Sequence, residues 1–231
     1  MYEQGVEPSL ERTLLADGTS LGMHESQSRL WENLVGRSLH FWNHYYPNAP
    51  AAFPEALAGV SLDDFYRAIN RVSPSLIRVE ADEVTYNLHI MVRFELEVGL
   101  LEGSISVDEL PAAWNDRMEE YLGVRPETDS DGVLQDIHWS LGALGYFPTY
   151  ALGNLISTQL FNQAASEIDD LDGKIESGSF DDLLDWLRKN VHVHGRRKSA
   201  TQILEDATGS GLSVDSWIHY VEKKYEKVYG S

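Results

Sequence analysis

The chain has 231 residues, of which 42% are hydrophobic, and this is enough for a sizeable core. It contains no cysteine, which excludes disulfide frameworks, thiolate zinc sites and cysteine nucleophiles, so any metal must be held by histidine and carboxylate side chains. Its 37 acidic residues against 18 basic ones give a formal net charge of −19, which argues against nucleic acid as a partner because no basic stripe is left to neutralise phosphates.

The first part of the chain is predicted to form one helix over residues 21–46. Ser20 is a residue type that caps helix N-termini, and Pro47 marks the stop. Between them apolar residues recur at helical spacing. Glu25 therefore lies inside a helix, about one turn after its start.

The middle of the chain alternates predicted helices with connections rich in proline, glycine and polar residues. A proline- and alanine-rich connector over 47–54 leads to a short helix that begins near Ser61. The elements predicted next are a long helix over 75–102, a helix over 107–121, a polar loop over 126–132, and an irregular, glycine-interrupted segment with a short helix over 132–147. The long helix is predicted although β-branched residues occur in its first third.

The last third of the chain is predicted to be helical as well. Pro148 suits the first turn of a helix that extends to about residue 175. Shorter helices are predicted over 179–191, 200–207 and 214–228. No alternating strand pattern, internal repeat or strong linker is present, so the sequence predicts an all-α helical bundle that forms a single domain over residues 1–231.

The distribution of apolar and charged residues limits partners and location. No apolar run approaches the ~20 residues of a transmembrane helix, and no basic segment leads into an apolar stretch at the N-terminus. The sequence thus predicts no membrane partner and a cytoplasmic location. Carboxylates are spread along the chain and most basic residues are arginine, a balance that resembles proteins of salt-loving organisms. Ordinary acidic solubility is the alternative.

Three motifs in order, and the opening residues, indicate a family. The motifs are His24-Glu25-Ser26-Gln27, Ile77-Arg78-Val79-Glu80-Ala81-Asp82 and Gly132-Val133-Leu134-Gln135-Asp136-Ile137-His138-Trp139. They resemble the His-Glu-Ser/Thr-Gln, Ile/Val-Arg-x-x-Ala-Asp and Gly-x-x-Gln-Asp-x-His-Trp motifs of the carboxypeptidase Taq family of zinc metallocarboxypeptidases. The opening Met1-Tyr2-Glu3-Gln4-Gly5 is similar to the residues that directly follow the zinc helix of that family. The resemblance covers essentially the whole chain, but only about the C-terminal half of a usual family member.

The resemblance implies the fold and activity of the C-terminal half of a zincin-like helical metallopeptidase. The intact enzyme would release C-terminal amino acids from peptides with a divalent metal, zinc or cobalt as its substitute, and a homodimer is implied. The His-Glu-x-x-His sequence, which carries two zinc ligands and the general base, does not occur in the 231 residues. We therefore expect weak or no zinc binding and no activity from this chain alone.

Three hypotheses are compatible with this absence. The chain is a truncated or misread product whose upstream sequence holds the zinc helix. Alternatively, it is one subunit of a split peptidase, completed by a separate N-terminal half. A third possibility is a non-catalytic helical interaction module that kept the fold.

The resemblance assigns the metal and the substrate carboxylate to two residues. Glu25 is implied as the third metal ligand, with His24 and Gln27 supporting it. Arg78 is implied as the residue that binds the terminal carboxylate of a substrate, because a planar guanidinium can pair with both carboxylate oxygens. The alternative for Arg78 is an ion pair with Asp82, one turn further along the predicted helix.

The same resemblance assigns the oxyanion to His138 and Tyr150. Hydrogen-bond donors at this place stabilise the charge that develops when water adds to a peptide carbonyl. The alternatives are packing of His138 beside Trp139 and core packing of Tyr150.

Further polar residues are expected to support the site or to lie outside it. Asp82, Gln135 and Asp136 are expected to orient their neighbours. Glu32 lies on the same helical face as Glu25, either near the metal or paired with Arg29. Two further histidines, His192 and His194, do not share a helix face and are expected to be packing or surface residues.

Overall fold

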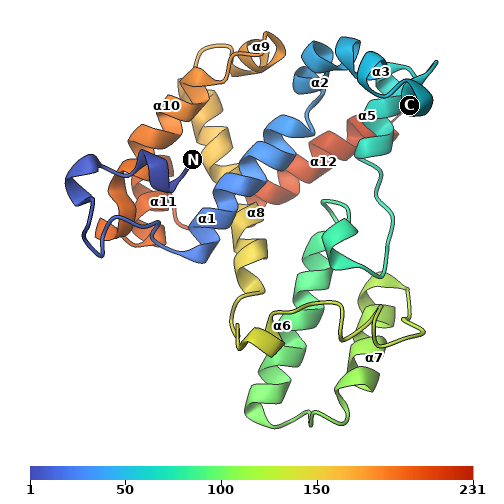
Figure 1. The fold of residues 1–231 in the computed structure, drawn as a ribbon. Coiled ribbons are helices and arrows are strands. Elements are labelled where there is room, and N and C mark those ends of the chain that lie inside the picture. Colours follow the sequence, from blue (N-terminus) through green and yellow to red (C-terminus); the bar gives the residue numbers. More distant parts are fainter. Residues whose placement is uncertain (231) are drawn as a thin grey trace. The chain divides into compact units, whose positions relative to one another are not determined.

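The computed structural model describes residues 1–230, and the regular secondary structure of these residues is helical, without β-strands (Figure 1). This confirms the predicted all-α class. The chain divides into two compact units. The first comprises Met1–Asn70 and the chain from Leu152 onward, and the second comprises Arg71–Ala151. The prediction that residues 1–231 act as a single domain stays a prediction.

The first unit contains ten α-helices within the described residues, and several of them surround an apolar core. The ten helices are α1 (Leu21–Arg29), α2 (Leu39–Tyr45), α3 (Ala49–Ala52), α4 (Pro54–Leu57), α5 (Leu62–Ile69), α8 (Pro148–Glu167, which begins in the second unit), α9 (Leu171–Glu176), α10 (Asp181–Asn190), α11 (Ala200–Thr208) and α12 (Asp215–Tyr229). Met23, Leu160, Leu187 and Ile203 bring α1, α8, α10 and α11 together in this core.

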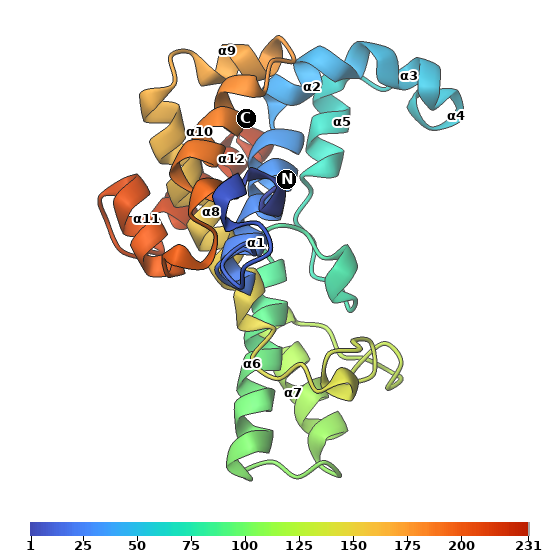
Figure 2. The ribbon, with the colours of Figure 1, turned by 60° about the vertical axis from the view of Figure 1, so that its left-hand side comes forward.

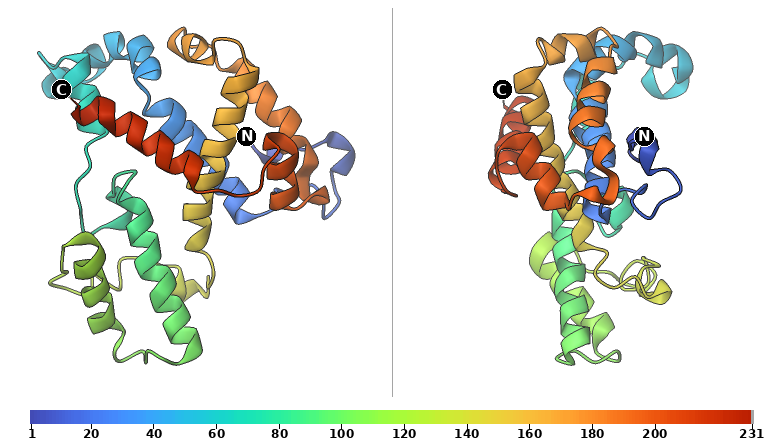
Figure 3. Two further views of the ribbon diagram at one scale, coloured as in Figure 1. Left: turned by 180° about the vertical axis from the view of Figure 1, so that it is seen from behind. Right: turned by 90° about the vertical axis from the view of Figure 1, so that its left-hand side faces the viewer.

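The outer helices are tied to this core by neighbouring elements. Helices α2 and α9 lie side by side (Figure 2). The Tyr220 hydroxyl on α12 donates at 3.3 Å to the carbonyl of Asn33, which lies in the segment Leu30–Gly36 that follows α1 (Figure 3). None of the helices in residues 1–230 has the length and apolar character needed to cross a bilayer.

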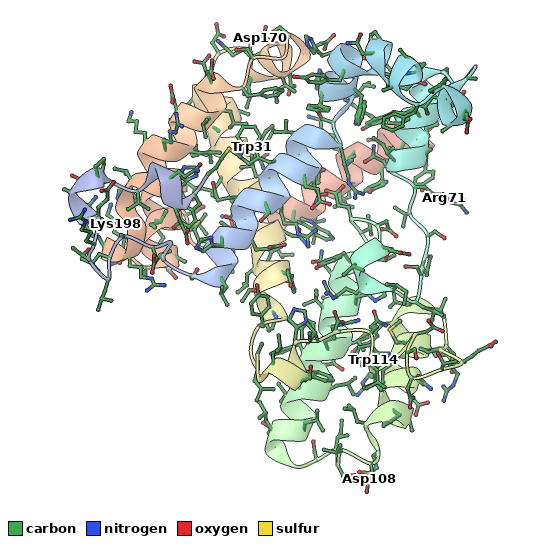
Figure 4. All side chains as sticks on the ribbon, viewed as in Figure 1. Trp31, Arg71, Asp108, Trp114, Asp170 and Lys198 are labelled. Carbon is green, nitrogen blue, oxygen red and sulfur yellow. The ribbon has the colours of Figure 1, made fainter. Side chains whose placement is uncertain are left out.

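The second unit is built on a helix pair, α6 (Tyr86–Glu102) and α7 (Leu110–Leu122). The pair packs through buried apolar residues, including Leu96 on α6 and Trp114 and Met118 on α7; Trp114 is labelled in Figure 4. Gly103 ends α6 with a φ of 75°, a left-handed conformation that glycine adopts without strain.

The long helix predicted over 75–102 is wrong in its first eleven residues, because α6 begins at Tyr86. Asp82 competes with the helix: its Oδ1 accepts hydrogen bonds from the main-chain N–H groups of Val84 and Thr85, both at 2.9 Å. Residues 71–81, which precede it, have no regular secondary structure except a single 3-10 turn at Arg78–Glu80. Arg78 is thereby placed on an irregular segment.

Side-chain caps also interrupt two other predicted helices. The helix over 21–46 is divided, because the π-helical turn Leu30–Gly36 follows α1 and the Ser38 hydroxyl caps a new start at α2. The helix over 148–175 is broken at Asp170, which has a φ of 49° and whose carboxylate accepts from the N–H of Gly173 at the start of α9. The connector predicted over 47–54 is wrong as well, since the short helices α3 and α4 form there.

Other local predictions are confirmed. Ser20 and Ser61 cap α1 and α5, with each hydroxyl accepting from a main-chain N–H three residues later. The segment over 132–147 is irregular and contains one 3-10 turn, Trp139–Leu141. At these places the chain therefore folds as its local chemistry indicates.

The acidic composition predicts that added salt stabilises the fold. A net charge of −19 makes the carboxylates repel one another in the compact state, and salt screens this repulsion, with a Debye length of about 3 Å at 1 M. We expect the melting temperature to climb steeply over the first few hundred millimolar of chloride or of sulfate at equal ionic strength. Above that range sulfate should stabilise more, since it favours apolar burial. A flat melting temperature would contradict the salt-adapted interpretation.

Candidate functional site

Arg78 lies in a buried polar cluster of the second unit, where its side chain is held on several sides. The residue is 6% exposed. Its Nε donates to Asp136 Oδ1 at 3.0 Å, Nη2 donates to the same oxygen, and Nη1 donates to the Tyr86 hydroxyl at 2.8 Å. Its main-chain N–H donates to Gln135 Oε1 at 2.9 Å. The alternative ion pair with Asp82 is wrong, because Arg78 pairs with Asp136 and the Asp82 carboxylate accepts from the main-chain N–H groups of Val84 and Thr85 before α6 begins.

A second arginine shares the same carboxylate. Arg93, on α6, is 0% exposed and donates from Nε to Asp136 Oδ2 at 2.6 Å. Its Nη2 donates to Gln135 Oε1 at 2.8 Å. Asp136 and Gln135 thus each contact both arginines, and Gln135 is itself anchored by donating to the carbonyl of Leu76 at 3.0 Å.

The electrostatics of this cluster leave it with positive charge. Burial raises the pKa of Asp136, but the hydrogen bonds and charges of the two arginines outweigh it and hold the pKa below its usual range. Burial lowers the pKa of Arg93 to about 10, so Arg93 stays protonated at neutral pH. Two guanidiniums against one carboxylate give the three side chains a net charge of about +1.

A second buried carboxylate, that of Glu97, lies on α6 one turn after Arg93, and its hydrogen-bond donors are neutral. The Trp139 indole donates to its Oε2 at 2.7 Å, and the Gly145 N–H donates to its Oε1. No ion pair within the described residues joins Glu97 to either arginine of the cluster.

His138 and Tyr150 lie together, as a shared role requires. His138 Nε2 is 3.1 Å from the Tyr150 hydroxyl, and its Nδ1 is 3.7 Å from Asp136 Oδ1. The imidazole packs against Phe147, with ring centroids 4.4 Å apart. Burial lowers the pKa of His138, so the ring is neutral at pH 7 and one of its nitrogens carries a proton to donate.

Glu25 lies on α1 of the first unit, where a glycine of α8 meets it. A Cβ added to Gly153 would lie 2.6 Å from the Cγ of Glu25, so only glycine permits this approach of the two helices. Arg29 Nε donates to Glu25 Oε1 at 2.7 Å. Arg29 and Arg37 also pair with Glu32, as the second of the two readings for Glu32 predicted.

His24 and Gln27 link α1 to other segments of the first unit. The His24 ring packs edge-on against Tyr2, and its Nε2 is 3.6 Å from Glu3 Oε1. Gln27 is buried, with Oε1 2.8 Å from His192 Nε2. His192 is fully buried, as expected of a packing residue, but the sequence did not indicate its polar partner.

The described residues do not fit a complete metal site. No group of three His, Asp or Glu side chains within residues 1–230 could hold a metal ion. Glu25 offers one carboxylate, which is paired with Arg29. A zinc peptidase site needs three protein ligands and an open position.

Sequence reasoning missed two members of the cluster, Arg93 and Tyr86, and the nearby buried carboxylate of Glu97. The available signal was the pair Arg93 and Glu97, one turn apart in a helix whose face there is otherwise formed by buried residues such as Ile90 and Leu96. Charged side chains are almost never fully buried without partners, so their position calls for partners elsewhere in the chain.

The all-α chain matches the family model of a metallopeptidase over residues 1–225, and this match defines its class. The chain belongs to the carboxypeptidase Taq (M32) metallopeptidase family, whose profile matches residues 1–225. The resemblance inferred from the motifs is thereby confirmed.

Individual relatives are similar along the whole chain. Carboxypeptidase 1 of Bacillus subtilis (strain 168) is 46% identical over 229 residues, or 99% of this chain and 46% of the relative. Thermostable carboxypeptidase 1 of Thermus thermophilus is 50% identical over 230 residues, or 100% of this chain and 45% of the relative. The crystal structure of M32 carboxypeptidase from Deinococcus radiodurans R1 has a TM-score of 0.95 at 46% identity, covering 100% of this chain and 46% of that one. The chain thus spans about half the length of these relatives.

Proposed function

We propose that this chain forms part of a metal-dependent carboxypeptidase that removes C-terminal amino acids from peptides. The observation that carries the proposal is the Arg78 cluster, whose net positive charge and guanidinium donors suit a terminal carboxylate. The relatives named carboxypeptidases support the same reaction class.

The donor inventory of Arg78 supports this role. A guanidinium has five N–H groups, and three of them donate to Asp136 and Tyr86. One N–H therefore remains on each terminal nitrogen. Two such donors match the two oxygens of a carboxylate, which is the geometry that makes arginine selective for it.

We assign His138 and Tyr150 to the oxygen of the scissile carbonyl. Their polar atoms lie 3.1 Å apart, close enough to act on one oxygen. A neutral imidazole and a phenol each have one proton to donate, and donors held in place before the reaction stabilise charge as it develops. Asp82, Gln135 and Asp136 contribute by fixing backbone and side chains around Arg78.

We assign Glu25 to the metal as one carboxylate ligand. The remaining ligands and the general base would come from residues outside these 231, on the same polypeptide or on a separate one. Zinc is the metal we propose, with cobalt as a substitute. Four exposed apolar residues in the His138 segment support a partner surface: Leu134, Ile137, Leu141 and Leu144. A homodimer and a cytoplasmic location stay predictions.

The test separates metal binding from carboxylate recognition. It uses this chain completed, in cis or in trans, by the remaining part of a family member. Arg78→Gln should leave metal content unchanged and lower the preference for a free over an amidated C-terminus by about 30-fold, since hydrogen bonds to charged groups contribute about 1.5–3 kcal/mol. Glu25→Ala should lower metal occupancy at limiting zinc, measured by elemental analysis. Arg117→Gln, at an exposed arginine, is the control. Full occupancy in Glu25→Ala would overturn the ligand assignment.

A further inference from the structure

We propose that Arg93 is a positioning residue. By sharing the Asp136 carboxylate, Arg93 prevents that carboxylate from fully neutralising the charge of Arg78, and it thereby sets the preference for a free carboxylate. The inference rests on the proposed function, because it concerns how Arg78 recognises its ligand. It assigns a role to a residue that none of the motifs contains.

The inference rests on how the two oxygens of the Asp136 carboxylate are shared between the two arginines. Arg93 takes Oδ2, and Arg78 donates only to Oδ1. The single negative charge is therefore shared between two guanidiniums. Neither arginine is fully neutralised, and Arg78 also keeps two N–H groups for a ligand.

Arg93 itself has no access to a ligand. It is fully buried, and its guanidinium carbon lies 4.5 Å from the centroid of the Trp114 ring. Its three nitrogens donate inside the unit, to Asp136, to Gln135 and to the carbonyl of His89 at 2.9 Å. Any effect of Arg93 on a bound carboxylate must therefore pass through Asp136 and Gln135.

Removing Arg93 has a definite electrostatic consequence. Both oxygens of Asp136 then become available to Arg78, and a bidentate arginine–carboxylate pair is neutral overall. A ligand carboxylate would meet this neutral pair and would compete with Asp136 for the same guanidinium. The affinity for a free acid should fall, whereas an amide carries no charge and should be little affected.

The experiment uses the 231-residue chain and titrates N-benzoylglycine and its amide, followed by the NMR signals of arginine Nε–H groups. The wild type should prefer the acid, and Arg78→Gln should abolish the preference. Arg93→Gln should reduce the acid-to-amide affinity ratio about tenfold. The double variant Arg93→Gln/Asp136→Asn should restore it, because Arg78 is again without a neutralising carboxylate. Arg117→Gln is the matched control at a surface ion pair and should match the wild type.

The rescue separates positioning from a structural role. A residue needed only for folding would not be rescued by removing a second hydrogen-bonding partner, so a double variant as weak as Arg93→Gln would overturn the inference. If Arg93→Gln does not fold, the inference is tested by the double variant and by Arg93→Lys, which keeps the positive charge. In both variants the acid-to-amide affinity ratio must then stay within about threefold of the wild-type value. A wild type without preference would overturn the proposed function, whereas an unchanged ratio in Arg93→Gln would overturn only this inference.

Discussion

The 231-residue chain on its own should release no amino acid from a peptide, and this loss should be complete. Water attack on a peptide bond in a zinc peptidase needs a metal held by three protein ligands and a base that activates the water. Within residues 1–230 no three suitable side chains converge, and Glu25 is paired with Arg29. Carboxylate binding by Arg78 and donors at His138 cannot replace the missing attack.

The measurement is hydrolysis of a blocked dipeptide, with and without added zinc, together with calorimetric titration of the chain with zinc. We expect no turnover above the buffer rate and weak zinc binding, since a single carboxylate falls far short of the about 10–16 kcal/mol of structural zinc sites. Adding the remaining part of a family member, in cis or in trans, should restore activity. Turnover by the chain alone that a chelator abolishes and zinc restores would contradict the prediction and require a different ligand set.

Local chemistry made parts of the fold predictable. Ser20 and Ser61 mark helix starts and Gly103 marks a helix end, because the hydrogen bonds and backbone angles involved lie within a few residues. The errors have the same origin. At Asp82 and Asp170 a side chain offers the backbone an alternative partner, and apolar periodicity alone does not reveal which of the two is favoured.

The sequence motifs identified several residues of the candidate site, but they did not indicate which of these residues contact one another. The motifs name Arg78, Asp136 and His138, yet the ion pair between Arg78 and Asp136 joins residues 58 positions apart. Periodicity suggested Asp82 as the partner of Arg78 because it assumed a helix that does not form. Arg93 shows the opposite case. Its burial is visible only once α6 has packed on α7, although a charge inside an apolar run is a warning.

Acid should unfold this chain through two buried histidines, His89 and His192. Both side chains are 0% exposed. Burial, together with the charges of Arg93 and Arg78, lowers the pKa of His89 to about 4. Burial, together with the N-terminal amine and Arg188, lowers the pKa of His192 to about 4. The unfolded chain, with an ordinary histidine pKa of about 6.5, binds these protons first.

The sign and the window of the pH dependence follow from these values. The stability that depends on neutral histidines is complete above about pH 6.5, and it is lost progressively as pH falls toward about 4. Each histidine can contribute about 3 kcal/mol to this loss, at 1.36 kcal/mol per pKa unit. Near pH 5 the free energy of unfolding should fall by about 2.4 kcal/mol per pH unit for the pair. Asp136, whose pKa lies below its usual range, adds a further loss only at lower pH.

Denaturant unfolding at a series of pH values measures this slope, and substitution of His89 tests its origin. Neither ring nitrogen of His89 has a hydrogen-bond partner, so His89→Phe removes the titrating group without breaking a bond. The slope of the variant near pH 5 should be smaller than that of the wild type by about 1.2 kcal/mol per pH unit, the share of one histidine, and its acid midpoint should lie at lower pH. His219→Gln, at an exposed histidine on α12, should leave both unchanged. A His89→Phe variant with the full wild-type slope would mean that the proton taken up on unfolding binds elsewhere, because a group that is absent cannot contribute to the pH dependence.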